Sequence, residues 1–353
     1  MEEGQTHILI IKLSAIGDVV HSLPLLEALR ERYHKARIDW VVEEDAAGIV
    51  EGHPCINELF IFPRKTWLRR VSKNGDRTSL GREAARFVRR LRRNRYDIVI
   101  DLQGLLKSGL LTFLARGERK IALNNGREGS SLFVHERIAL PAKEIHALEK
   151  YLHIARHLGV ENPQWQGYIP IYESDKSYID SLLQDLEPYG LLIAINPMAK
   201  WETKLWEPDR FALLADFLNE RLDATVIFTG SPADKKPVGQ IQSKMETAAL
   251  NLAGRITLKQ LAYLYQRCAV VISTDTGPMH IAAAMKSPAV VALFGPTSPV
   301  RTGPYGSAQK VVRSGAACSP CFKKRCSDMR CMRQITVDMV YDAVEEVLAR
   351  SDL

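Results

Sequence analysis

Two stretches of the 353-residue sequence combine residue types that could bind a phosphate group. In the first, a branched apolar run ends in the polar turn 273–276, which contains Asp275 and Thr276, and Gly277 and Pro278 follow it. Hydroxyl and carboxylate side chains cap helix amides, glycine admits a ligand close to the backbone, and proline suits a first helical turn. The predicted helix, which carries His280, would therefore begin beyond a strand with free amides and a positive dipole end, where an anion binds.

The second stretch lies near the N-terminus and has the same order of strand, turn and helix. The apolar run 7–13 is followed by Ser-Ala-Ile-Gly-Asp at residues 14–18, and an apolar helix is predicted after it. Asp18 would stand at the edge of a crevice on a turn made by Gly17. A carboxylate there is suited to accept a proton, although capping the helix is a plausible alternative role.

The elements that must position these turns alternate between strands and helices. We predict strands at residues 7–13, 38–42, 58–62, 97–102 and 121–123 in the first half, and at 191–195, 225–228, 268–273 and 289–294 in the second. We predict helices at 19–33, 46–51, 146–158, 208–222, 258–267 and 336–350, and one from 79 or 82 to 93. This alternation is typical of parallel sheets in an α/β fold.

The length favours two domains, each a doubly wound Rossmann-like sheet. The strand–helix rhythm loosens between residues 161 and 189, which include Pro163, Pro170 and Pro188. We therefore predict domains over 1–175 and 176–353, with the last helix as a candidate to pack back on the first domain. Ligands bind beyond the carboxyl ends of the strands in such sheets, so the predicted site is a central crevice that the two domains face.

Composition and charge limit the class of protein. The chain is 46% hydrophobic and 25% charged, and no apolar run approaches the roughly 18 residues of a membrane span. The acidic start leads directly into a strand, so a cytoplasmic protein without a signal peptide is expected. The net charge of +7 is concentrated in residues 64–95, which hold 13 Lys or Arg against two acids. This segment predicts a local anionic partner, such as a phosphorylated substrate or an anionic membrane surface.

Common nucleotide-binding classes are disfavoured. No Gly-x-Gly-x-x-Gly follows a predicted strand, and no phosphate loop of the Gly-x-x-x-x-Gly-Lys-Ser/Thr type is present. A dehydrogenase or a phosphate-loop NTPase is therefore not expected. The basic segment contains one Trp and one Phe and no known nucleic-acid module, so nucleic acid is not expected as a partner.

Four motifs, taken together, resemble those of a known family. They are Ser14-Ala15-Ile16-Gly17-Asp18 with Leu23-Pro24, residues 101–108 (Asp-Leu-Gln-Gly-Leu-Leu-Lys-Ser), Asp275-Thr276-Gly277-Pro278-Met279-His280, and Phe294-Gly295-Pro296-Thr297. In this order they resemble the heptosyltransferases of lipopolysaccharide core synthesis, which belong to glycosyltransferase family 9 and have the GT-B fold. Residues 126–128 and 146–150 resemble the first heptosyltransferase of the pathway, which modifies Kdo-lipid A. The cysteine-rich tail is more similar to members nearer the second enzyme, or to broader members of the family.

The resemblance implies a role for each matching residue. Asp18 would be the general base of an inverting displacement, and Lys204 the cation that meets the diphosphate leaving group without a metal. The implied donor-binding residues are Gly17, Lys200, Gly230, Ser231, Asp275, Thr276, Gly277, Pro278 and His280. Candidates for the phosphates and carboxylates of the acceptor are Arg64, Lys65, Arg69, Gln103 and Arg127, since guanidinium groups match such oxyanions. His280 could equally be a packed core residue.

Four cysteines at 318, 321, 326 and 331 form a separate cluster in the sequence. Four thiolates within such a short stretch could bind structural zinc. The spacing differs from that of paired zinc knuckles, so free or redox-labile thiols are the alternative. In either case Cys318, Cys321, Cys326 and Cys331 are expected to have a structural role.

The function implied is transfer of L-glycero-D-manno-heptose from ADP-heptose to Kdo-lipid A, without a cofactor, at the cytoplasmic face of the inner membrane. The alternatives are heptosyltransferase II, a related transferase with another acceptor or nucleotide sugar, and a non-catalytic sugar-nucleotide-binding protein of the same fold. The presence of both Asp18 and Lys204 favours an enzyme, because binding alone requires no base.

Overall fold

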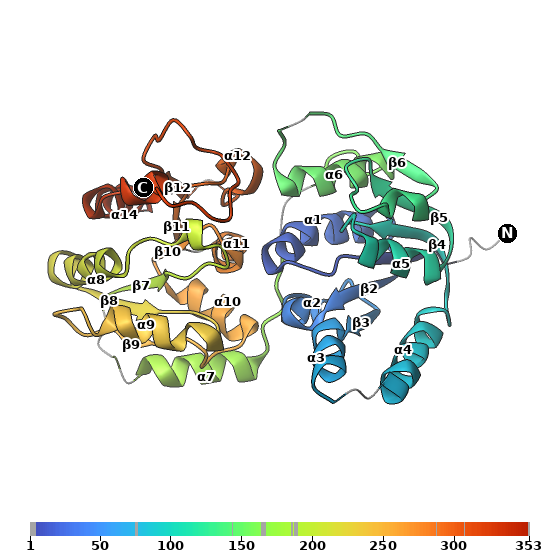
Figure 1. The fold of residues 1–353 in the computed structure, drawn as a ribbon, viewed down its shortest axis with the longest axis horizontal. Coiled ribbons are helices and arrows are strands. Elements are labelled where there is room, and N and C mark those ends of the chain that lie inside the picture. The colour runs from blue at the N-terminus through green and yellow to red at the C-terminus, as the bar shows by residue number, and fades with distance from the viewer. Residues whose placement is uncertain are drawn as a thin grey trace. The chain divides into compact units, whose positions relative to one another are not determined.

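The computed structural model describes residues 5–74, 77–142, 144–163, 167–184, 186, 190–286, 288–306 and 308–351. The chain divides into two compact units, Met1–Pro170 and Ile171–Leu353, called unit 1 and unit 2 below. Each has its own sheet and its own helices (Figure 1). The predicted boundary at 175/176 instead falls inside α7 (Glu173–Gln184), whose polar sequence does not show a clear helical pattern.

Unit 1 is built on a six-stranded parallel sheet. Its strand order is β3-β2-β1-β4-β5-β6. The strands are β1 (His7–Ile11), β2 (Arg37–Glu43), β3 (Glu58–Phe62), β4 (Arg95–Asp101), β5 (Arg116–Leu123) and β6 (Glu136–Ile138). The central strand β1 has an almost wholly buried apolar sequence, as expected of a strand covered on both faces.

Helices cover both faces of this sheet. They are α1 (Ile16–Arg32), α2 (Ala47–Val50), α3 (Arg64–Asn74), α4 (Arg77–Leu91), α5 (Leu106–Leu114) and α6 (Ala147–His157), with the short 3₁₀ turns η1 (Glu44–Ala46) and η2 (Ser130–Phe133). α1 packs on α6 and α2. The apolar core on the other face includes residues of α4 and α5. α3 was not predicted. The sequence Asn74-Gly75-Asp76 at its carboxyl end indicates a loop, of which Gly75 and Asp76 lie outside the described residues.

Unit 2 repeats the same topology with new strands. Its order is β12-β11-β10-β7-β8-β9, and every pair is parallel. The strands are β7 (Leu191–Asn196), β8 (Ala224–Phe228), β9 (Leu250–Asn251), β10 (Val270–Thr274), β11 (Ala289–Leu293) and β12 (Gln309–Val312). Both units therefore have the doubly wound order that was predicted.

The helices of unit 2 form two layers. They are α7, α8 (Pro208–Leu222), α9 (Lys235–Gln242), α10 (Leu258–Arg267), α11 (Gly277–Met285), α12 (Pro299–Thr302), α13 (Arg330–Arg333) and α14 (Val337–Ser351), with η3 (Glu202–Lys204) and η4 (Pro232–Asp234). α14 packs on α8 and on β10, β11 and β12, while α10 packs on α7 and α11. A contact between the last helix and unit 1 stays a prediction.

The topology fixes where a ligand site can form. In unit 1 the strand order reverses between β1 and β4, and in unit 2 it reverses between β7 and β10. Loops that leave neighbouring strands in opposite directions open a crevice at their carboxyl ends. None of the described helices combines the length and the apolar content that a bilayer span requires.

Candidate functional site

In unit 1, Asp18 lies in the first turn of α1, beyond the carboxyl end of β1. The helix begins after Ala15, whose side chain cannot cap it, and the Ala15 amide instead donates to Asp18 Oδ2 at 3.1 Å. The Asp18 side chain remains 41% exposed. The carboxylate is thus held in one orientation while much of it stays open to a ligand, as a general base requires. The preceding Gly17 is buried.

Lys12, which the sequence analysis did not single out, lies beside Asp18. Its side chain is 3% exposed, and Nζ is 3.9 Å from Asp18 Oδ2. Nζ also donates to the Leu102 carbonyl at 3.3 Å and lies over the Tyr151 ring. Burial opposes the charge of Lys12, but Asp18, Tyr151 and Asp101 together outweigh it and raise the pKa of this lysine. Lys12 is therefore a buried cation that faces the candidate base.

The turn after β4 supports the same loop. Buried Asp101 accepts from the amides of Gln103 and Gly104 through Oδ1, at 2.9 and 3.0 Å, and from Ser108 Oγ through Oδ2. Gln103 Oε1 in turn accepts from the amides of Leu13 and Ser14, at 3.2 and 3.0 Å. The structure therefore gives Gln103, a predicted acceptor ligand, a positioning role: it fixes the loop that leads into Asp18.

In unit 2, Lys204 and Asp275 form a tight ion pair at the reversal between β7 and β10. Lys204 Nζ is 2.6 Å from Asp275 Oδ2 and donates to the Asp275 carbonyl at 3.0 Å. Thr297 Oγ1 donates to the same Oδ2 at 2.6 Å. The side chains of Asp275 and Lys204 are 5% and 16% exposed. Asp275, a predicted donor ligand, thus orients the predicted leaving-group cation.

The helix that starts beside this pair is α11. Its N-cap is half-buried Thr276, which makes no side-chain capping bond, and Gly277 and Pro278 form the first turn. The uncapped amides and the helix dipole favour an anion at this end. His280 is 7% exposed on the apolar side of α11. Phosphate-binding geometry and a cation therefore meet at one place in unit 2.

Comparisons with known proteins identify the family of the chain. The family model of glycosyltransferase family 9 (heptosyltransferase) matches residues 84–331. The chain belongs to glycosyltransferase family 9. It is 32% identical to the lipopolysaccharide heptosyltransferase 1 of Pseudomonas aeruginosa, over 91% of this chain and 87% of that protein.

Solved structures show the same fold over the whole chain. A family 9 glycosyltransferase from Veillonella parvula superposes with a TM-score of 0.85 at 26% identity, covering 99% of each chain. The E. coli heptosyltransferase WaaC, solved with ADP, gives a TM-score of 0.75 at 27% identity, covering 97% of this chain and 100% of its own. The predicted GT-B fold is confirmed; that the two units face one crevice stays a prediction.

The predicted acceptor cations of this glycosyltransferase differ in their surroundings. Arg64 Nε is 2.8 Å from Glu43, which also binds Lys107 at 2.6 Å. Burial alone would raise the pKa of Glu43, but Lys107 and Arg64 outweigh it and lower the pKa. Lys65 pairs with Asp45.

Two further acceptor candidates lie on the surface. Arg69 and Arg127 are exposed, and the Arg127 amide donates to the Gly104 carbonyl. The structure therefore brings the loop of Arg127 next to the turn of Gln103, whereas Arg69 lies on α3.

The other donor candidates of the glycosyltransferase lie at neighbouring strand ends. Gly230 and Ser231 follow β8, and Ser231 donates through N and Oγ to Asp234 Oδ2, at 2.8 and 2.6 Å. A Cβ at Gly230 would lie 2.9 Å from Asp234, so this turn requires glycine. Lys200, after β7, is exposed. These residues share the sheet edge on which Lys204 lies.

The four-cysteine loop lies beside the Lys204 region. Thr203 Oγ1 donates to the Lys323 carbonyl at 2.8 Å, and the Cys321 amide donates to the Pro296 carbonyl. All four thiols of Cys318, Cys321, Cys326 and Cys331 are free. Within the described ranges, no group of three or more His, Cys, Asp or Glu side chains is arranged to hold a metal ion. Cys318, Cys321 and Cys326 lie near enough to Cys331 to help raise its pKa, after the larger effect of burial, and a structural zinc site at these thiols stays a prediction.

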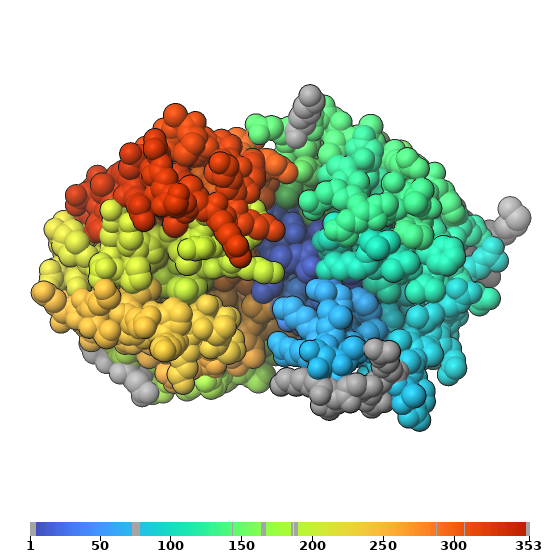
Figure 2. Space-filling view, in the orientation of Figure 1, coloured from blue at the N-terminus to red at the C-terminus, as the bar shows by residue number. Residues whose placement is uncertain are grey.

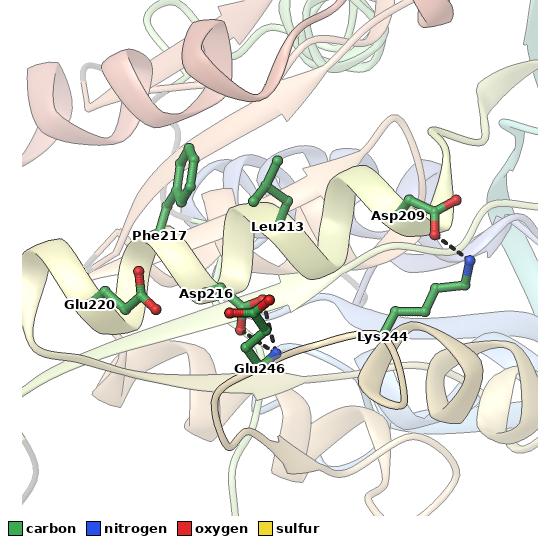
Figure 3. A pocket seen from close by; sticks show the side chains of 7 residues that line it. All are labelled: Asp209, Leu213, Asp216, Phe217, Glu220, Lys244 and Glu246. Atoms are coloured by element: carbon green, nitrogen blue, oxygen red, sulfur yellow. Dashed lines mark hydrogen bonds and ion pairs between the residues drawn. The ribbon is translucent and has the colours of Figure 1, made fainter.

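A polar hollow elsewhere in unit 2 has a structural explanation. It measures about 260 Å³ and lies between α8 and the loop around Lys244 (Figure 3). Lys244 pairs with Asp209, and Asp216 accepts from the amides of Glu246 and Thr247. Because these groups tie the loop to α8, we assign the hollow no part in the glycosyltransferase site.

Proposed function

We propose that this glycosyltransferase moves L-glycero-D-manno-heptose from ADP-heptose to Kdo-lipid A, as a lipopolysaccharide heptosyltransferase I. The observation that carries the proposal is the Lys204–Asp275 pair beside the uncapped start of α11, because a nucleotide diphosphate requires a cation and free amides together. The similarity to a heptosyltransferase 1 and to a heptosyltransferase solved with ADP supports this donor and acceptor.

The leaving group is stabilised in unit 2. An ammonium has three donors, and Asp275 occupies two of those of Lys204 through its carboxylate and its carbonyl. The third is then available to a diphosphate oxygen, with the amides around Thr276 and Gly277 for the others. Lys204 supplies the positive charge at the departing phosphate, so the proposed reaction requires no metal ion.

The attacking group is activated in unit 1. Asp18 takes the proton of the acceptor hydroxyl while the oxygen of that hydroxyl forms a bond to the anomeric carbon of heptose. The bond from that carbon to the diphosphate oxygen breaks, ADP leaves, and the anomeric configuration inverts. Arg69 and Arg127 are exposed, and we propose that they contact the phosphates and carboxylates of the acceptor, with Arg64 and Lys65 beside them.

The acceptor is a membrane lipid, so the enzyme is proposed to work at the cytoplasmic face of the inner membrane. The basic helices α3 and α4, which span most of the segment 64–95, supply an electrostatic attraction to anionic lipid.

The test is transfer measured by mass. The purified protein is incubated with ADP-heptose and heptose-free Kdo-lipid A without added metal, together with the variants Asp18→Asn and Asp209→Asn. One added heptose is expected with the parent and with Asp209→Asn, a surface control in unit 2. Asp18→Asn keeps an oxygen for the Ala15 amide but loses the base, so its rate should fall by about 100-fold or more.

Each other outcome has a distinct meaning. No transfer with this pair, but transfer to an acceptor that already carries heptose, would make the enzyme a heptosyltransferase II. Donor binding without transfer to any acceptor would indicate a non-catalytic binding protein. Full activity of Asp18→Asn would remove Asp18 from the mechanism.

A further inference from the structure

Helix α5 exposes its largest apolar side chains. Leu106, Leu110 and Phe113 are 44%, 46% and 62% exposed, and their spacing places them on one face. The buried residues of the same helix are Ser108, Gly109, Leu111 and Thr112. A helix that covers a sheet normally has its apolar side inward. α5 instead has a second apolar face directed to the surface of unit 1.

The turn η2 extends this outer face. Leu132 is 80% exposed, and the Phe133 ring packs against the Phe113 ring at a centroid distance of 5.9 Å. η2 approaches α5 closely because residue 109 is glycine: a Cβ there would lie 2.5 Å from the Phe133 side chain. Leu106, Leu110, Phe113 and Leu132, called the α5–η2 face below, are therefore exposed side chains of two elements that pack on each other. The segments that contain α5 and η2 are coloured teal and green in Figure 2.

Cations lie at both ends of the α5–η2 face. At the carboxyl end of α5, Arg92 and Lys120 donate to the carbonyls of Leu114 and Phe113, at 3.1 and 3.2 Å, and exposed Arg116 follows. At the other end lies exposed Arg127. Glu128 is the acidic neighbour there, and its carboxylate accepts from the Leu106 amide at 3.2 Å. The rim of the apolar face is therefore predominantly positive.

We propose that the α5–η2 face rests on an anionic bilayer, with its leucines and phenylalanine at the boundary between headgroups and acyl chains. An exposed helical face with apolar residues in the middle and cations at the rim is the arrangement that lies in this boundary. The cations match the negative lipid headgroups. This inference deepens the proposed function, on which it rests, because it places the membrane contact on α5 and η2 as well as on α3 and α4.

The α5–η2 face lies close in the chain to the loop that leads into Asp18, so a membrane contact there would affect the candidate base. α5 begins directly after the turn of Asp101 and Gln103, and Gln103 holds the loop that leads into Asp18. A bilayer under α5 would keep the base close to the surface from which a lipid-anchored acceptor hydroxyl extends. Docking would then raise the local concentration of acceptor at Asp18.

The test is binding to vesicles by cosedimentation. Vesicles of phosphatidylethanolamine with phosphatidylglycerol are compared with vesicles of phosphatidylcholine alone. The double variant Leu110→Gln/Leu132→Gln removes two apolar groups and should weaken binding to the anionic vesicles about tenfold or more. The matched control is Leu213→Gln/Val300→Gln, which alters two apolar side chains of unit 2 that are 45% and 58% exposed and should change nothing.

A second measurement separates this inference from the proposed function. Transfer is measured to vesicle-embedded Kdo-lipid A and to a deacylated, soluble acceptor. The Leu110/Leu132 variant should lose activity with the embedded acceptor relative to the soluble one. If the parent transfers heptose to neither, the proposed function fails, and vesicle binding still decides the inference.

Three results would overturn the inference. The double variant could bind anionic vesicles as the parent does, or the parent could bind none. Alternatively, the parent could be a dimer that the double variant, and not the control, dissociates, in which case a second copy of the chain covers the α5–η2 face.

Discussion

The Lys204–Asp275 pair allows stability and catalysis to be separated in one set of variants. Nζ and Oδ2 are 2.6 Å apart, and the side chains are 16% and 5% exposed. In Lys204→Met, Asp275 keeps the Thr297 hydroxyl as a donor but loses its counter-ion. In Asp275→Asn, the side-chain oxygen remains as an acceptor for both partners. The double variant has no buried charge at this place.

The magnitudes follow from the burial. Removing one partner of a buried ion pair costs about 3–5 kcal/mol. We expect about 3 kcal/mol for Lys204→Met, since Thr297 still donates and Lys204 is partly exposed. In unit 2, of domain size, that is a fall of about 6–12 °C in Tm. The double variant should regain about 2 kcal/mol of this free energy of unfolding, because the uncompensated carboxylate is gone.

The transfer activity of the double variant should not recover as its stability does. In the proposed mechanism Lys204 supplies the charge that meets the diphosphate, so both Lys204→Met and the double variant should have kcat/KM lowered by about 100-fold or more. Free energies of unfolding are measured by urea titration with circular dichroism and Trp fluorescence, and transfer by mass. A double variant whose loss of stability equals the sum of the two single losses would refute the coupling. Transfer at the parental rate by Lys204→Met would refute the role at the phosphate.

Two further predictions concern groups with shifted pKa. Lys107 and Arg64 hold the pKa of Glu43 in the folded protein below 4.5, its ordinary value. The ion pairs of Glu43 therefore stabilise the fold above pH 4.5, and this stabilisation is lost as the pH falls through the pKa that Glu43 has in the folded protein. Glu43→Gln should therefore lower the free energy of unfolding by about 1 kcal/mol at pH 7, and the difference should vanish in acid; a pH-independent difference would contradict this. Exposed Cys326, whose pKa the amides of Met329 and Asp328 lower, should react with iodoacetamide before buried Cys268, whose pKa burial raises to about 12. Peptide mapping after brief labelling at pH 7 measures the order, and equal labelling of both thiols would contradict it.

The sequence predicts the centre of each unit better than its edges. The predicted strands at 38–42 and 191–195 and the helix at 208–222 agree closely with β2, β7 and α8, because buried apolar runs and a Pro-led helix start leave clear patterns. The edge strands β6, β9 and β12 were missed since they have two to four residues and little apolar sequence. α3 was missed because eight of its eleven residues are basic or polar, and its three apolar residues form no clear stripe.

The sequence predicts where the site residues lie in the fold, but not which side chains form ion pairs with one another. The turns that carry Asp18 and Asp275 follow strands that the apolar runs reveal, and both lie where the strand order reverses. Lys12 was not predicted as a site residue because it lies within the predicted strand 7–13, directly after β1. The contact of Lys204 with Asp275 spans 71 positions, and nothing local in either segment indicates it; the parallel pairing of β7 with β10 creates it.

Each unit places a lysine and a carboxylate beside the point where its strand order reverses, with opposite exposure. In unit 1 the lysine is buried and Asp18 is 41% exposed, whereas in unit 2 Asp275 is 5% exposed and Lys204 is the more accessible partner. A buried ion orients its partner, and the exposed ion is the one that a substrate can reach. Unit 1 therefore offers a carboxylate and unit 2 an ammonium. A base for the acceptor and a cation for the leaving phosphate are the two groups that the proposed reaction requires, so under that proposal the same fold serves both halves of the reaction by exchanging which ion it buries.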